Sequence, residues 1–285
     1  MTTDDAIVDH YERDDLVGSI EAALGELGRP IDDLTVDDLA PVDEFHVGGR
    51  PATASFMDRL ELESPMRVLD VGCGLGGPAR FAATTYGCAV TGIDLTASYI
   101  EAAGTLTGWV GLDDTVSFRK ASTADLVDDG AGDGRSIEPF DAAYLMHVGM
   151  NVADKPALFA DIARLLKPGG TLGIYDLLRF DDGELGYPMP WASSAATSFV
   201  ETTVAYESGL AAAGFELVVA QERQDMATAF VATVGQAAAS SSGPPSPVGL
   251  HLVMGSTIGA KVRNLTAALE AELLKPVELL ARRAP

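Results

Sequence analysis

The fold is decided by residues 68–77, which read Val-Leu-Asp-Val-Gly-Cys-Gly-Leu-Gly-Gly. The apolar residues at the start of this stretch are typical of a short buried strand, and the glycines stop that strand. Pro78 follows at once, and residues 78–86 are typical of a helix with proline in its first turn. A helix that begins directly after glycines presents free backbone N–H groups to a ligand. The stretch therefore predicts a binding site at a strand-to-helix turn.

The segments that follow repeat this strand-to-helix order. Strands are predicted at residues 67–71, 89–94, 116–120, 140–146 and 171–178, and helices at residues 78–86, 96–106 and 154–166. Residues 125–139 are polar and rich in glycine, which predicts a surface loop. The alternation predicts a Rossmann-like α/β fold, a doubly wound and mostly parallel sheet with helices on both faces.

The two ends of the chain are predicted to add helical segments to this sheet. Residues 1–60 are predicted to form an N-terminal helical or lid segment, and residues 61–222 the binding core. Residues 223–285 are predicted to form a helical cap, inserted before a final edge strand near residues 277–282. We therefore expect one α/β domain with two additions.

The charge of the chain restricts its partners. Its 285 residues include 42 Asp and Glu against 19 Lys and Arg, a formal net charge of −23. Nucleic acids and anionic membranes are bound through Lys and Arg, so neither partner is expected. The expected partner is a small-molecule substrate. The sequence leaves the oligomeric state open, and a homodimer is one assembly that it allows.

Metal and membrane sites are not predicted. Only Cys73 and Cys88 occur, which excludes a disulfide scaffold and a Cys-rich zinc module. The four histidines do not cluster with Asp or Glu at zinc-ligand spacing. The acidic start lacks the apolar part of a signal peptide, and no apolar run reaches the roughly 18 residues of a membrane span. We therefore expect a cytoplasmic protein.

Two acidic residues indicate which ligand the glycine turn binds. Gly72, Gly74 and Gly77 satisfy the dinucleotide pattern G-x-G-x-x-G, which by itself also fits an NAD-dependent oxidoreductase. Asp70 directly precedes the glycines, where a carboxylate would repel a pyrophosphate and favour a ligand with a cationic amine and a sulfonium. Asp94 ends the next strand, where an acid accepts hydrogen bonds from a ribose diol. The alternative for Asp94 is a helix cap or a surface acid.

Four motifs in order resemble those of class I S-adenosylmethionine-dependent methyltransferases. They are the glycine turn, Gly-Ile-Asp-Leu at residues 92–95, Phe-Asp-Ala-Ala-Tyr at residues 140–144, and Leu-Leu-Lys-Pro-Gly-Gly at residues 165–170. A finer pattern is similar to the sarcosine/dimethylglycine N-methyltransferase type. It comprises residues 44–49, residues 147–151 and the loop around Trp191. The resemblance implies a seven-stranded methyltransferase sheet, with S-adenosylmethionine as the cofactor.

The resemblance also implies which residues contact the cofactor. Asp70 would lie near its amine, Asp94 would bind the ribose hydroxyls, and Leu95 would pack against the adenine. Ser122 stands where many relatives have an aspartate at the adenine edge. The full implied set is Asp70, Gly72, Cys73, Gly74, Asp94, Leu95, Ser122, Thr123 and Met146. Cys73 is expected to fit a tight space in the turn rather than to react.

Two histidines are candidates for catalysis. Methyl transfer from a sulfonium needs an acceptor with a free lone pair, and histidine is well suited to take a proton from an amine. His147 ends a strand at the edge where open α/β sheets bind ligands. His46 lies in a glycine loop that can close over the cofactor. The alternative for His147 is a structural histidine with satisfied hydrogen bonds, and for His46 an ordinary turn residue.

Two aromatic residues are candidates for contacting the substrate. Tyr187 and Trp191 lie among prolines in the loop after the fifth predicted strand. Aromatic rings there can form a cation–π wall for an ammonium group. The alternative for each of them is packing in the core or the cap.

The predicted function is methyl transfer from S-adenosylmethionine to a small molecule. N-methylation of an amine such as glycine, sarcosine or dimethylglycine is the first choice. O-, C- or S-methylation of a metabolite or natural product is the alternative. An NAD-dependent oxidoreductase and a non-catalytic binding module that kept the fold are the more distant alternatives.

Overall fold

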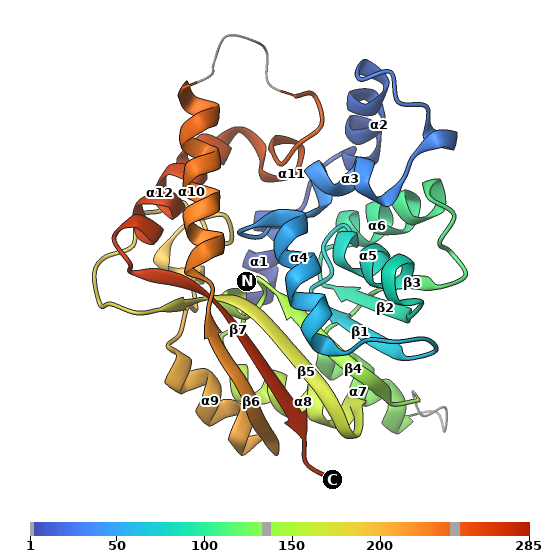
Figure 1. Cartoon of the computed structure of the whole chain (residues 1–285), viewed down its shortest axis with the longest axis vertical. Helices are drawn as coiled ribbons and strands as arrows, with labels where there is room; N and C mark the ends of the chain where they lie inside the picture. The colour runs from blue at the N-terminus through green and yellow to red at the C-terminus, as the bar shows by residue number, and fades with distance from the viewer. Residues whose placement is uncertain (1–2, 133–137, 240–245) are drawn as a thin grey trace.

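A computed structural model describes residues 3–132, 138–239 and 246–285. A seven-stranded sheet forms the centre of the molecule, with the strand order β3-β2-β1-β4-β5-β7-β6 (Figure 1). The first five strands are parallel, and β7 is antiparallel to both of its neighbours. The strands are β1 (Arg67–Val71), β2 (Ala89–Asp94), β3 (Val116–Lys120), β4 (Phe140–Met146), β5 (Leu166–Arg179), β6 (Phe215–Glu222) and β7 (Leu274–Arg283). The predicted doubly wound α/β fold is confirmed.

Helices cover both faces of this sheet, and further helices lie at the carboxyl ends of its strands (Figure 1). The helices that pack against the sheet are α4 (Gly49–Met57), α5 (Gly77–Tyr86), α6 (Ala97–Trp109), α7 (Thr123–Gly132), α8 (Lys155–Leu165) and α9 (Thr203–Ala212). The N-terminal segment adds α1 (Thr3–Tyr11), α2 (Leu16–Glu26) and α3 (Val36–Asp43). The C-terminal segment adds α10 (Gln224–Ala239), α11 (His251–Met254) and α12 (Ile258–Glu270).

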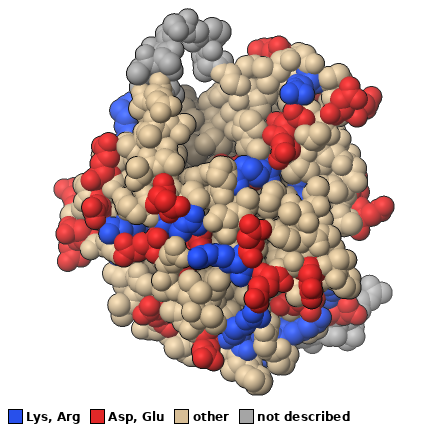
Figure 2. Space-filling view, in the orientation of Figure 1, with Lys and Arg blue, Asp and Glu red and all other residues tan. Residues whose placement is uncertain are grey.

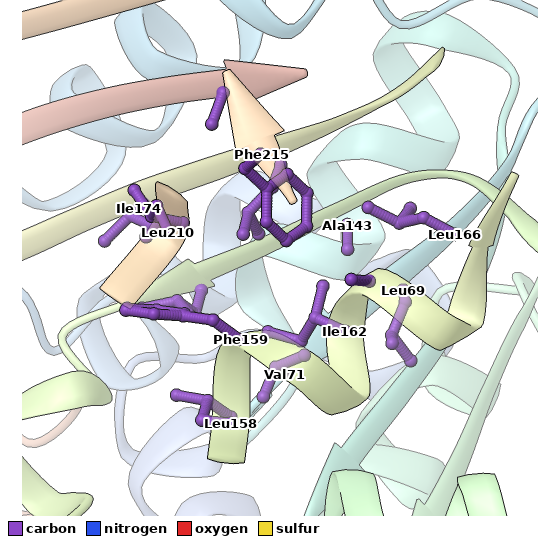
Figure 3. Packing of buried hydrophobic residues seen from close by; sticks show 14 of the residues in the cluster. Leu69, Val71, Ala143, Leu158, Phe159, Ile162, Leu166, Ile174, Leu210 and Phe215 are labelled. Atoms are coloured by element: carbon purple, nitrogen blue, oxygen red, sulfur yellow. The ribbon is translucent and has the colours of Figure 1, made fainter. Parts of the chain in front are cut away.

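The side chains of β1 show why the sheet is buried on both faces. Successive side chains of a strand point to opposite faces. Leu69 and Val71 pack in the same cluster as Phe159 and Ile162 of α8, as Figure 3 shows. Val68 points the other way, into the cluster that α4 and α5 supply. The apolar run that predicted a strand therefore contributes side chains to the hydrophobic clusters on both faces of the sheet.

The last strand is not the edge strand that the sequence predicts. β7 lies inside the sheet, where Leu279 pairs with Ile174 of β5 on one side and with Ala220 of β6 on the other. Its side chains are buried from Pro276 to Ala281, whereas β6 is largely exposed. A strand with both faces covered is stabilised more when it pairs with two neighbouring strands inside the sheet than when it pairs with one at the edge. Residues 223–285 thus contribute a core strand, and the three-segment division remains a prediction.

The predicted surface loop at residues 125–139 is wrong in its first half, which forms α7. Ser122 caps this helix. Its backbone N–H and its hydroxyl each lie 2.8 Å from Asp125 Oδ2, and the Asp125 N–H donates back to Ser122 Oγ at 3.1 Å. Leu126 is buried against the sheet. This reciprocal cap and the apolar residue behind it outweigh the polar composition. Residues 133–137 lie outside the described part.

The surface of the molecule carries the acidic excess of the sequence. Figure 2 shows Asp and Glu side chains spread over the visible face, with Lys and Arg interleaved among them. None of the described helices is long and apolar enough to cross a membrane.

Candidate active site

A cavity of about 460 Å³ lies at the carboxyl ends of the parallel strands. Its walls come from the ends of β1, β2 and β4, from α1, and from the C-terminal helices α11 and α12. This is the edge at which open α/β sheets bind ligands.

The cavity brings together most of the residues that the sequence singles out. Every residue of the implied cofactor set lines it, as do His46, His147 and Trp191. Tyr187 is not among the lining residues. Its half-buried ring packs against the apolar cluster beneath α10 and α12, which also contains the buried ring of Trp191. The structure therefore keeps Trp191 as a candidate for a substrate wall, and it does not bring Tyr187 to the site.

The glycine turn requires glycine at two positions, because of the backbone angles and the close approach of neighbouring side chains. Gly72 and Gly74 have φ angles of 72° and 53°, a region that side chains rarely adopt. A Cβ atom at Gly72 would come 2.4 Å from Val148 Cγ2, and one at Gly74 would come 2.9 Å from the ring of Phe45. Cys73 is buried between them, and burial raises the pKa of its thiol well above the usual range. The Cys73 thiol is thus neutral, and its expected role of filling a tight space in the turn remains a prediction.

Asp70 provides the strongest test of the cofactor. Its side chain is buried at the end of β1, and Oδ2 has no hydrogen-bond partner among the described residues. The pKa of Asp70 is raised to about 7, chiefly by burial and also by the charge of Asp94. The Tyr144 hydroxyl and the charge of Arg80 act on this pKa in the opposite direction. A ligand with an ammonium group would supply the missing partner and stabilise the carboxylate. The residues present therefore fit S-adenosylmethionine, which carries such a group.

Asp94 already holds the backbone around the glycine turn. Its Oδ2 accepts a hydrogen bond from the Gly74 N–H at 3.1 Å, and its Oδ1 accepts one from the Thr96 N–H at 2.9 Å. The second bond closes a local turn just before α6. Burial raises the pKa of Asp94, and these two bonds lower it together with hydrogen bonds from the Thr96 hydroxyl and the Leu95 N–H. Asp94 lines the cavity and is not the N-cap of α6, which is Thr96, and the ribose contact remains a prediction.

The Ser122 and Thr123 hydroxyls are engaged with the protein. Ser122 Oγ both donates to and accepts from Asp125, as described above. Thr123 Oγ1 donates to Asp161 Oδ2 at 3.3 Å. Both residues line the cavity, but a contact from Ser122 to an adenine amine would have to share the oxygen that caps α7. Asp161 also lines the cavity here, and sequence reasoning missed it.

His147 is held at the end of β4 with a free ring nitrogen. Its backbone N–H donates to the Tyr175 carbonyl at 2.7 Å, and its φ angle of 56° is unusual for a residue with a side chain. Nε2 is buried and has no hydrogen-bond partner in the part of the chain that the structure describes. Burial lowers the pKa of His147 well below its usual value, and His46 lowers it further. The imidazole is therefore neutral at pH 7.

His46 lies beside His147, with 5.8 Å between the ring centroids. Its Nε2 is 3.0 Å from Thr53 Oγ1 and 3.2 Å from the Gly49 carbonyl, and Thr53 donates its single hydroxyl hydrogen to Glu44 at 2.5 Å. Thr53 can then only accept from His46, so we assign the ring proton to Nε2. Burial lowers the pKa of His46 to about 4, which leaves Nδ1 with a lone pair.

Tyr11 and Asn151 form a contact that the sequence did not suggest. The Asn151 Nδ2 donates to the Tyr11 hydroxyl at 3.2 Å, and both residues line the cavity. Tyr11 belongs to α1, and Asn151 to the short helix after β4 (Gly149–Asn151). No motif links residues so far apart in sequence. The N-terminal segment thus covers the cavity, as a lid would.

We expect Asp94→Ala to weaken S-adenosylhomocysteine binding by about 1–3 kcal/mol, because a buried charged acceptor is lost from two backbone donors and from the ribose. Isothermal titration calorimetry measures this change. Glu101→Ala, an exposed acid on the following helix, is the matched control and should bind normally. Unchanged affinity in Asp94→Ala would remove Asp94 from the cofactor site.

In the described ranges, no group of three or more His, Cys, Asp and Glu side chains could hold a metal ion, and the absence of a metal remains a prediction.

Comparisons with known proteins identify the family. A family model described as a methyltransferase domain matches residues 49–220. Phosphoethanolamine N-methyltransferase 1 of Triticum aestivum is 33% identical over 178 residues, which are 62% of this chain and 34% of the wheat protein. The chain thus spans about a third of the length of such curated relatives.

Two solved structures share the fold. Phosphoethanolamine N-methyltransferase 2 of Haemonchus contortus, in complex with S-adenosyl-L-methionine, has a TM-score of 0.66 at 18% identity and covers 94% of this chain and 56% of its own. A putative sarcosine dimethylglycine methyltransferase from Galdieria sulphuraria has a TM-score of 0.60 at 17% identity and covers 81% and 83%. The family match decides against the oxidoreductase alternative. The chain belongs to the S-adenosylmethionine-dependent methyltransferases.

Proposed function

We propose that this methyltransferase transfers the methyl group to the nitrogen of a small amine. The observation that carries the proposal is the half-buried, neutral His147, whose Nε2 has no partner among the described residues and which lines the same cavity as the glycine turn. An amine is an ammonium ion at pH 7, and it has no lone pair until a proton is removed. A neutral imidazole has a lone pair for that proton, and its lowered pKa makes it a weaker base than a free histidine.

Other residues of the cavity would bind the cofactor, position the amine and exclude water. S-adenosylmethionine supplies a methyl group activated by a sulfonium. The glycine turn, Asp70 and Asp94 would hold it, and Met146 would lie beside the methyl at the end of β4. The protein must then hold the amine nitrogen about 3 Å from the methyl carbon, opposite the sulfur. Tyr11 on α1 and Trp191 after β5 cover this part of the cavity and would exclude water.

The relatives support an amine as the acceptor. Several relatives are named phosphoethanolamine N-methyltransferase, at 32–34% identity with this chain. Others are named for different acceptors or for none, among them a sterol 24-C-methyltransferase of Debaryomyces hansenii at 31%. Their matched segment covers only about a third of each plant protein. The substrate is therefore proposed from the site, and the relatives support only its chemical class.

A labelled-methyl transfer assay tests the proposal. The full chain is incubated with radiolabelled S-adenosylmethionine and, separately, with amines (ethanolamine, glycine, sarcosine, dimethylglycine, phosphoethanolamine), phenols, thiols and carboxylic acids. We expect labelled product only with amines. Transfer only to oxygen, carbon or sulfur acceptors would contradict the proposal. Tight S-adenosylhomocysteine binding without transfer to any acceptor would favour a binding module.

A further inference from the structure

Two cationic side chains line the C-terminal part of the cavity without an acidic partner. Lys261 is on α12 and only 3% exposed, and Arg13 follows α1. Among the described residues, no Asp or Glu lies within ion-pair distance of either cation. This is unexpected in a chain with a net charge of −23, in which acids outnumber bases about twofold.

The ammonium group of Lys261 is poorly satisfied by the protein. Its Nζ is 3.3 Å from the Met254 carbonyl and 3.4 Å from His10 Nε2. That histidine nitrogen is also 2.8 Å from the Pro190 carbonyl, which can only accept. The shorter contact places the proton on Nε2, so this nitrogen has no lone pair for Lys261. One long hydrogen bond therefore serves three ammonium hydrogens.

The guanidinium of Arg13 is held by neutral groups. Nε donates to the Val253 carbonyl at 2.7 Å, and Nη1 donates to the carbonyls of His10 and Glu12 at 3.0 and 2.7 Å. Nη2 donates to no described residue. Backbone carbonyls thus fix the guanidinium of Arg13 in place, and its Nη2 group remains free to bind a ligand.

Arg13 is half-buried, and the protein pairs its two strongly buried arginine side chains with acids, whereas the buried Lys155 is held by two backbone carbonyls. Arg80 contacts Asp43 at 2.6 Å, and Arg223 contacts Glu278. A buried cation without a counter-charge is costly, and a ligand anion removes that cost. Burial, together with the charge of Arg13, lowers the pKa of Lys261 to about 8. The positive charges of Lys261 and Arg13 therefore repel each other within the cavity.

The position of Lys261 fits the substrate rather than the cofactor, and Arg13 lies between it and the start of α6, where the Arg13 N–H donates to Ser98 Oγ at 3.3 Å. The glycine turn, Asp70 and Asp94 come from the strand ends, whereas Lys261, Met254 and Trp191 come from the C-terminal segment and the loop after β5. His147 belongs to the strand ends, and it lines the cavity that these two groups share. An acceptor molecule can therefore place its amine near His147 and a second group near Lys261.

We propose that Lys261 and Arg13 form an anion subsite, so that the acceptor is a small amine that carries a carboxylate or a phosphate group. This inference rests on the proposed function. Lys261 and Arg13 lie outside residues 49–220, the part of the chain that the family model matches.

Equilibrium binding tests the subsite separately from turnover. The full chain, saturated with S-adenosylhomocysteine, is titrated by calorimetry with glycine, phosphoethanolamine and ethanolamine. We expect at least one of the two anionic amines to bind about 10-fold or more tighter than ethanolamine, since a hydrogen bond between charged groups contributes that much. A preference for glycine would identify a carboxylate ligand, and a preference for phosphoethanolamine a phosphate ligand.

Substitutions at Lys261 test whether the preference for an anionic amine depends on the charge of that side chain. Lys261→Met should remove the preference and leave ethanolamine binding unchanged, whereas Lys261→Arg should keep it. Lys167→Met, on the surface, is the matched control and should behave as the unmodified chain.

Three results would overturn the subsite. The first is equal binding of all three amines, and the second is an unchanged preference in Lys261→Met. The third is a loss of S-adenosylhomocysteine affinity in Lys261→Met, which would show that Lys261 binds the cofactor and not the substrate. The proposed function would fail in a different measurement, because its failure is the absence of amine methylation in the transfer assay.

Discussion

Replacing His147 by Gln is expected to lower kcat by about 10²–10⁴-fold, the usual contribution of a positioned acid or base. The glutamine side chain has a similar reach but cannot accept a proton from the amine. The His147 ring contacts Tyr175 and His46, at centroid distances of 5.3 and 5.8 Å, and it forms no hydrogen bond that holds the glycine turn. Binding of S-adenosylhomocysteine should therefore remain close to that of the unmodified chain.

Single-turnover methyl transfer and calorimetry measure these two effects on the same preparation. His251→Gln is the matched control, because His251 is exposed and does not line the cavity. A parallel loss of kcat and of cofactor affinity in His147→Gln would assign a structural role to His147. Unchanged turnover would remove it from the reaction.

The second large effect is on stability, at the buried ion pair behind the glycine turn. Arg80 is fully buried on α5, and its Nη2 donates to Asp43 Oδ2 at 2.6 Å and to the Leu75 carbonyl at 2.7 Å. Nη1 donates to Thr107 on α6 at 3.0 Å. We expect Arg80→Met to lower the free energy of unfolding by about 3–5 kcal/mol, because Asp43 would remain buried without its partner. Urea denaturation followed by circular dichroism measures the loss.

Two further variants separate the charge from the packing. The double variant Asp43→Leu with Arg80→Met should recover much of the lost stability, since no unpaired charge remains. Arg119→Met removes an exposed pair with Asp129, and it should cost less than about 1 kcal/mol. Equal losses in the single and double variants would instead attribute the effect to the shape of the arginine side chain.

The cofactor half of the site was predictable from the sequence because it is local. The run at residues 68–77 determines a buried strand, a turn with positive φ angles and a helix start within ten positions. Asp94 follows at the end of the adjacent parallel strand, and parallel strands bring their carboxyl ends together. Local propensity and the rules of parallel sheets therefore place the implied cofactor residues around one cavity.

The substrate half was not predictable in the same way. Tyr11 and Arg13 come from the start of the chain and Lys261 from near its end, and no periodicity relates them. Trp191 and Tyr187 looked equivalent in the loop after β5, yet only Trp191 lines the cavity. Both side chains pack in the apolar cluster beneath α10 and α12, so only the path of the loop in the folded chain decides which of them also lines the cavity.

By itself, the sequence determined the doubly wound fold, the glycine turn and the family, since each depends on residues that are near in the chain or in adjacent strands. Only the tertiary structure decided that the last strand enters the sheet beside β5, that α1 covers the cavity, and that Lys261 and Arg13 share it. These features depend on burial and pairing between distant segments. Hydrophobic burial is non-directional, so a local pattern shows that a segment is buried but not against which partner.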